Sequence, residues 1–244
     1  MKTILSIVFA CTSLIVGAQN AIPQQLRAQM TMDRMTDPNG VGQSDLLYGI
    51  PPAPGKTVGD YYLDRKWNTG SIFLKDSERK IEGFPLKYDI KTQTIEILAN
   101  KTVKILDARK IKGMVWYDSL TQLGSFFANA GEFTEDGVPL VGLVEVMSDG
   151  QIPLLCYTTV WIKQADYVPA LDVGSRDDKI MKRKTYYYSI NHQITKITSK
   201  KKLLPAFGDR ASAVDAFIKT NDLSVNQPFD LKRIFDFFNA QPSK

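Results

Sequence analysis

Residues 86–106, LKYDIKTQTIEILANKTVKIL, decide the fold. Apolar and polar side chains alternate along this stretch, and short polar turns at residues 91–93 and 100–101 interrupt the alternation twice. Successive side chains of a β-strand point to opposite faces of a sheet, so the pattern is typical of strands with one buried and one wet face. Turns spaced this closely predict an antiparallel meander rather than parallel strands with helical crossovers.

The same pattern continues outward from this stretch in both directions. Further strands are expected at residues 71–75, 80–84, 111–117, 139–147, 152–163 and 184–197. Residues 119–133 show no clear period and are expected to be irregular, with phenylalanines packed beneath them. The prediction for residues 58–205 is therefore an antiparallel β domain in the form of a meander, a sandwich or an open barrel.

The C-terminal residues 206–244 are predicted to form a helical cap on this domain. Asp209 is positioned to cap a first helix, and a second helix begins at Phe229-Asp230. Their apolar faces, at a spacing of i, i+3 and i+4, are Ala213, Val214, Phe217 and Ile218, and then Leu231, Ile234, Phe235 and Phe238. Isolated helices of this length are marginal in water, so both are expected to dock on the sheet. The whole chain is then mainly β with two short C-terminal helices, or α+β by content.

The N-terminal residues 1–18 have the form of a secretory signal peptide. Lys2 supplies a positive start, residues 4–16 are mostly apolar, and small residues precede Gln19. This run is shorter than the roughly 20 residues of a transmembrane helix, and the alternative is a buried N-terminal helix. Ala10-Cys11 faintly resembles a lipoprotein signal, but the apolar run continues past Cys11. The sequence therefore predicts export to the periplasm, the outer membrane or the cell exterior.

Residues 19–57 are predicted to form a flexible tether. Glutamine and methionine come first, and proline and glycine dominate the second half, where they oppose regular structure. A short helix fits residues 24–34. The alternative is that part of the tether lies along the folded body as an arm.

The composition excludes several classes of protein. A hydrophobic fraction of 43% is too high for a wholly disordered chain. One histidine and two cysteines in 244 residues exclude a histidine-rich metal site and a disulfide scaffold. The sequence contains no P-loop, no dinucleotide-binding glycine motif and no Gly-x-Ser-x-Gly. We therefore expect no catalytic residue, no metal and no cofactor, and we expect Cys156 to be a small core residue.

One candidate binding site is an aromatic-carboxylate cluster within residues 60–67. Its members are Tyr61, Tyr62, Asp64 and Trp67. A flat ring can stack on a sugar, and carboxylates can accept hydrogen bonds from its hydroxyl groups. The cluster thus predicts a carbohydrate-binding protein, or a weak glycosidase if two carboxylates flank a cleft. The alternative is that Trp67 is a core residue flanked by solvated charges.

A second candidate site is a basic patch in a stretch without acidic residues. Residues 179–202 contain eight lysines or arginines, three tyrosines and no acid. The predicted anion-binding residues are Lys182, Arg183, Lys184, Lys200, Lys201 and Lys202. Such a surface attracts anionic lipid headgroups or an acidic polysaccharide, and the predicted export argues against nucleic acid. The alternative is a solvated strand face that ends in a basic loop.

Several segments resemble those of a family of secreted β-rich proteins of Gram-negative bacteria whose function is unknown. The segments are residues 61–64, 83–90, 94–97 and 217–221, and the resemblance covers most of residues 59–240. It implies an exported bacterial protein and brings no catalytic residue with it. We expect a non-enzymatic envelope protein that acts as a binding or structural component through contacts with an envelope protein. The alternatives are the carbohydrate-binding protein and an envelope-surface binder that uses the basic patch.

Overall fold

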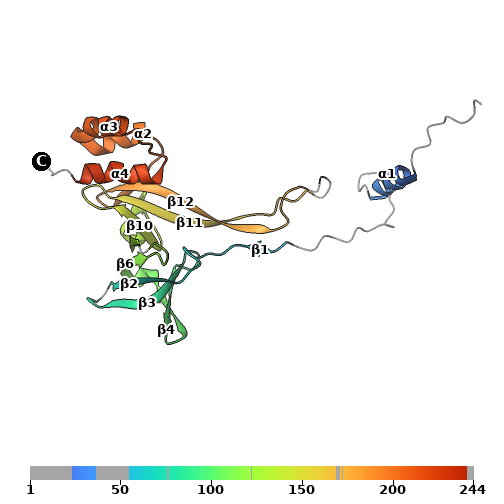
Figure 1. Ribbon diagram of the computed structural model, residues 1–244, viewed down its shortest axis with the longest axis horizontal. Helices are drawn as coiled ribbons and strands as arrows, with labels where there is room; N and C mark the ends of the chain where they lie inside the picture. The colour runs from blue at the N-terminus through green and yellow to red at the C-terminus, as the bar shows by residue number, and fades with distance from the viewer. Residues whose placement is uncertain are drawn as a thin grey trace, which may run out of the picture. The chain divides into compact units, whose positions relative to one another are not determined.

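The computed structural model describes residues 24–36, 55–75, 77–121, 123–168, 171 and 173–240 (Figure 1). The predicted signal peptide, Cys11 and most of the predicted tether lie outside these residues. The chain divides into two compact units, Met1–Ala53 and Pro54–Lys244. Helix α1 (Gln24–Thr36) lies in the first unit and confirms the helix expected at residues 24–34. None of the described helices is long and apolar enough to cross a membrane.

The second unit is built on one mostly antiparallel sheet, which confirms the predicted mainly β fold. The described strands are β1 (Thr57–Val58), β2 (Asn68–Leu74), β3 (Lys80–Asp89), β4 (Thr94–Ala99), β5 (Thr102–Asp107), β6 (Ile111–Tyr117), β7 (Gly124–Asn129), β8 (Thr134–Glu135), β9 (Val138–Pro139), β10 (Leu143–Ser148), β11 (Leu154–Lys163), β12 (Asp178–Ile190) and β13 (Gln193–Lys196). Their order is β5-β4-β3-β2-β6-β7-β10-β11-β12-β13-β8-β9, and β1 pairs with β12. Two pairings in this sheet, β1 with β12 and β13 with β8, are parallel.

Three expected boundaries differ from the structure. Residues 80–89 form the single strand β3 rather than ending at residue 84, because Gly83, with a positive φ of 80°, is the extra residue of a bulge in β3 opposite Gly70 and Ser71 of β2. Residues 119–133 contain the regular strand β7, in which Phe127 is buried while Phe126 is exposed. Because β7 carries apolar side chains on both faces, its sequence does not alternate between apolar and polar residues, and the strand was not predicted. Strand β1 begins at Thr57, the last residue of the predicted tether, and pairs with β12.

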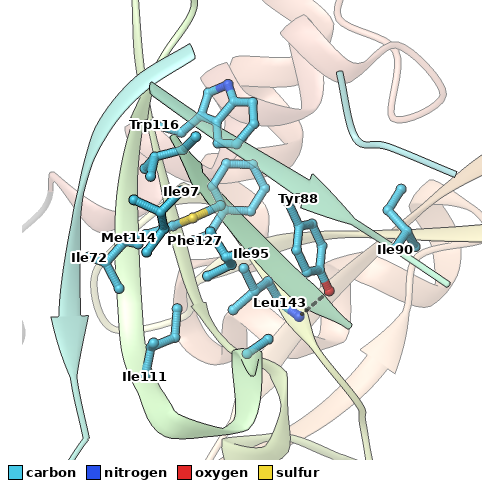
Figure 2. Packing of buried hydrophobic residues seen from close by; sticks show 12 residues of the cluster. Ile72, Tyr88, Ile90, Ile95, Ile97, Ile111, Met114, Trp116, Phe127 and Leu143 are labelled. Atoms are coloured by element: carbon cyan, nitrogen blue, oxygen red, sulfur yellow. Dashed lines mark hydrogen bonds between the residues drawn. The ribbon is translucent and has the colours of Figure 1, made fainter. Parts of the chain in front are cut away.

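One core lies inside the half of the sheet formed by β2 to β7. Ile72, Ile95, Met114 and Phe127 are buried together there (Figure 2). The backbone N–H of Leu143 in β10 donates a hydrogen bond to the hydroxyl of Tyr88 in β3 at 3.1 Å. Because β3 and β10 are not neighbours in the strand order, this contact shows that the sheet curls around its core.

A second core joins the C-terminal helices to the sheet. The helical elements are α2 (Lys200–Leu203), a 3₁₀-helix (Leu204–Arg210), α3 (Ala211–Thr220) and α4 (Pro228–Asn239). The predicted apolar residues of α4 are all buried, and they pack with Ile152 and Leu154 of the sheet. The side chain of Asn239 accepts a hydrogen bond from the N–H of Ile152 and donates one to its carbonyl group. The helices are therefore part of the folded body, as Figure 1 also shows.

The start of the helical region differs from the prediction. Helix α2 begins at Lys200, inside the stretch expected to be β-sheet, and the hydroxyl of Ser199 caps it. Asp209 does not cap α3, because the 3₁₀-helix runs through it to Arg210 and α3 begins directly afterwards. The helical period is clear only within α3 and α4, and the short turns of residues 200–210 carry no such period, so the start of the helical region was predicted too late.

Candidate functional site

The aromatic-carboxylate cluster lies in the loop between β1 and β2, and its members bind their neighbours. Tyr62 and Trp67 are partly buried, and the ammonium group of Lys87 lies 5.0 Å and 4.7 Å from their ring centroids. The hydroxyl of Tyr62 donates to Glu96 at 2.9 Å. Lys91 lies over the ring of Tyr61. The ring faces that these two lysines cover are not free to stack on a sugar.

Asp64 shapes this loop through hydrogen bonds. Its carboxylate accepts from the backbone N–H of Lys66 at 3.0 Å and from the side-chain amide of Asn68, also at 3.0 Å. Asn68 is fully buried, and its carbonyl oxygen accepts from the N–H of Ser119 at 2.8 Å. Asp64 thus helps to hold the loop against the sheet.

The structure brings one end of the aromatic-carboxylate cluster against the basic patch. The carboxylate of Asp60 accepts hydrogen bonds from Arg65 and, at 3.0 Å, from Lys182 of β12. Burial alone would raise the pKa of Asp60, but the hydrogen bonds from Arg65 and Lys182 outweigh it and hold that pKa below its ordinary value. A shallow groove of about 530 Å³ lies between the loop at residues 59–66 and residues 180–182 of β12.

The basic patch is divided between two elements. Residues 182–184 lie on β12, whereas residues 200–202 lie on α2. Lys182 pairs with Asp60, and Lys200 pairs with Asp215 at 2.9 Å. Lys184, Lys201 and Lys202 are exposed, and no carboxylate of the described residues lies within 4.0 Å of their ammonium groups.

Beyond the main sheet, β11 and β12 continue as a two-stranded ribbon. The pairing of β10 with β11 ends at Cys156, and that of β13 with β12 begins at Tyr187. Residues 157–163 and 179–185 pair with each other, and β1 joins β12 only at its far end. We call these two segments the ribbon. At about 3.3 Å per residue it is roughly 20 Å long, and Figure 1 shows the two strands running on beyond their neighbours.

The two faces of the ribbon have different surroundings. Directly paired residues of an antiparallel ladder share a face. Val160 packs against the first core, Ile180 and Lys182 line the groove, and Met181 of the opposite face also borders it. The opposite face, which we call the ribbon face, carries Thr159, Trp161, Met181 and Arg183. Trp161 is 43% exposed and Met181 40% exposed, and the guanidinium of Arg183 lies 5.7 Å from the ring centroid of Trp161.

Trp161 and Met181 are not among the site residues predicted from the sequence. The available signal was that residues 157–163, YTTVWIK, place apolar side chains on both faces of one strand. Such a strand is ordinarily covered on both sides. Whether a neighbouring strand covers residues 157–163 depends on where β10 ends, and the local sequence pattern does not indicate that end.

Other candidate chemistry is sparse in the part of the chain that the structure describes. No group of three or more histidine, cysteine, aspartate or glutamate residues is placed there to hold a metal ion. Cys156 is buried, and burial raises the pKa of its thiol to about 11, so the thiol stays protonated at neutral pH. The chain matches no protein-family model, no curated protein and no solved structure, so the resemblance to secreted bacterial proteins stays an expectation.

Proposed function

We propose that this chain is an exported, non-enzymatic binding protein of the bacterial envelope that contacts a partner protein through the ribbon face. The observation that carries the proposal is the exposed side chain of Trp161 beside Met181 and Arg183. Tryptophan, arginine and methionine are enriched at protein interfaces, and tryptophan and arginine dominate binding energy there. The proposed export rests on the predicted signal peptide at residues 1–18, and the proposed protein contact rests on the ribbon face.

The energy available at the ribbon face supports a specific contact. A tryptophan buries about 150–250 Å² in a core or interface. Covering the exposed 43% of Trp161 would remove roughly 90 Å² from water, which contributes about 2 kcal/mol at about 25 cal/mol per Å². The neighbouring Met181 and Arg183 extend the same surface. A few such anchors are enough to dominate a protein interface.

The two alternative functions have less support from the geometry. A sugar that stacks on the covered ring faces of Tyr62 and Trp67 would have to displace Lys87. An electrostatic surface built on the whole basic patch would include Lys182 and Lys200, which already pair with carboxylates. On the ribbon face Arg183 lies near the ring of Trp161, but 43% of Trp161 stays exposed.

Site-specific photo-cross-linking tests the proposal. A benzophenone amino acid replaces Trp161, and the chain is irradiated in the cells that export it. Tyr117 of β6 is the matched control position, because it is also aromatic, lies in a strand and is 42% exposed. We expect one discrete protein adduct from position 161 that position 117 does not give.

A second measurement separates the candidate partners. Against the cross-linked protein in purified form, Trp161→Ala should weaken binding at least about tenfold, whereas a Lys201→Gln, Lys202→Gln double variant should bind within about threefold of the parent. The absence of any protein adduct at position 161 would contradict the proposal. Adducts formed only with lipid or polysaccharide would contradict it as well, and would favour an envelope-surface binder.

A further inference from the structure

The outer edge of β11 offers unpaired main-chain groups. The N–H of Ser189 donates to the carbonyl of Pro153 at 3.1 Å, and the register of β11 with β12 continues without a shift to Lys163. Hydrogen-bonded and non-hydrogen-bonded pairs alternate in an antiparallel ladder. The N–H and C=O groups of Thr158, Val160 and Ile162 are therefore directed away from β12. The described residues supply no backbone hydrogen-bond partner for these outward groups.

This edge lacks the features that usually prevent strand pairing. Residues 158–163 are two threonines, a valine, a tryptophan, an isoleucine and one terminal lysine. Edge strands are ordinarily guarded by charges, proline or a bulge, and the β-ladder with β12 shows no bulge here. The edge strand β5, at the far end of the sheet, differs because it carries Lys104 and Asp107. The β11 edge instead combines high β-propensity with little charge, which favours the addition of a strand.

Charge around the edge selects the kind of strand that can be added. Arg183 and Lys184 lie on β12 directly opposite Thr159 and Thr158, and no carboxylate of the described residues lies within 4.0 Å of either cation. Strands are about 4.8 Å apart, so a strand added beside β11 lies about 10 Å from β12, close to the Debye length in physiological salt. A second copy of this chain would bring the same cations to the interface. An acidic segment would gain attraction instead.

We infer that the open edge of β11 binds an extended, acidic segment of the partner protein as an added β-strand, through the outward main-chain groups of Thr158, Val160 and Ile162. This inference rests on the proposed function and names the form of the partner. Main-chain hydrogen bonds hold the added strand beside β11, and the side chains on the ribbon face contact every second side chain of the added strand, which gives specificity.

A displayed library of random twelve-residue peptides, selected on the full chain, tests this inference. We expect the enriched peptides to be acidic and to alternate apolar with polar residues. The affinity of the most enriched peptide should fall at least about tenfold in Ile162→Pro and change less than about threefold in Ile162→Thr. Proline removes the outward N–H and leaves the bonds to β12, whereas threonine keeps that N–H and the strand conformation.

Each other outcome overturns the inference. No enrichment, enrichment of basic or neutral peptides, or equal loss in Ile162→Pro and Ile162→Thr would each contradict a main-chain site for an acidic strand. A dimer in light scattering that Ile162→Pro dissociates would assign the edge to a second copy instead. If the protein adduct at position 161 persists unchanged in Ile162→Pro, the edge inference fails and the proposed function stands. If peptides bind the edge but position 161 gives no protein adduct, the proposed function fails.

Discussion

Replacing Phe235 by alanine should destabilise the sheet and the helices together. Phe235 is fully buried in the core that joins α4 to Ile152 and Leu154, and its ring lies edge-on to that of Phe207 with centroids 5.3 Å apart. Phe→Ala in a core costs about 3–5 kcal/mol, against a total stability of about 5–15 kcal/mol. For a unit of this size the melting temperature should fall by roughly 6–20 °C.

Two probes followed during the same urea titration decide whether this core is shared. In a background with Trp67→Phe and Trp161→Phe, fluorescence of Trp116, which is buried in the other core, reports on the β2–β7 half of the sheet, and circular dichroism at about 222 nm reports on the helices. Both transitions should move together to lower urea. Phe229→Ala is the control, because Phe229 lies on the same helix but is 72% exposed, and it should change stability by less than about 0.5 kcal/mol. Loss of the helical signal alone, with the Trp116 transition unmoved, would refute the reasoning.

Three further predictions concern the groove and the buried polar groups. Asp60→Asn removes the ion pairs with Arg65 and Lys182, so it should lower the free energy of unfolding by about 1 kcal/mol near neutral pH. The folded-state pKa of Asp60 lies below its unfolded value of 3.8, so this stabilisation is complete above pH 3.8 and is lost as the pH falls through the folded-state pKa. The urea midpoints of parent and variant should therefore converge in acid. Midpoints that stay apart would contradict the prediction. The thiol of Cys156 should label slowly at pH 8 in the folded chain and readily in urea, as peptide mass spectrometry can measure, and rapid labelling of the folded chain would contradict its burial. Asn68→Ala, which removes the link between Asp64 and Ser119, should lower the free energy of unfolding by about 1–3 kcal/mol, and an unchanged urea midpoint would show that this link is not stabilising.

The regular parts of the fold could be predicted because burial imposes a local period on them. Ile95 and Ile97 point to one face of β4 and are both buried, as their alternation indicates. The four apolar residues of α4 recur at helical spacing and are all buried. Ala213 of α3 was expected on the buried face but is exposed, because a small side chain marks a helix face poorly.

The arrangement of the candidate site could not be predicted in the same way. Asp60 and Lys182 are separated by 122 residues, and nothing in either local pattern specifies that they meet. The aromatic-carboxylate cluster was identified by residue type, but its engagement with Lys87 depends on the neighbouring strand β3. The ribbon depends on β10 and β13 ending before β11 and β12 do. Strand ends and strand order are set by packing of the whole sheet rather than by any one segment.

Residue-resolved amide hydrogen exchange of the free chain tests the central claim most directly, namely that the ribbon presents an open edge to a partner. The amides of Thr159 and Trp161 bond to β12 and should exchange at least about tenfold more slowly than those of Val160 and Ile162, which have no partner among the described residues. An alternating pattern of slow and fast exchange along residues 158–162 is the predicted result. Uniform protection would mean that the edge is already paired, and uniformly fast exchange would mean that the ribbon is not formed; either result would contradict the account.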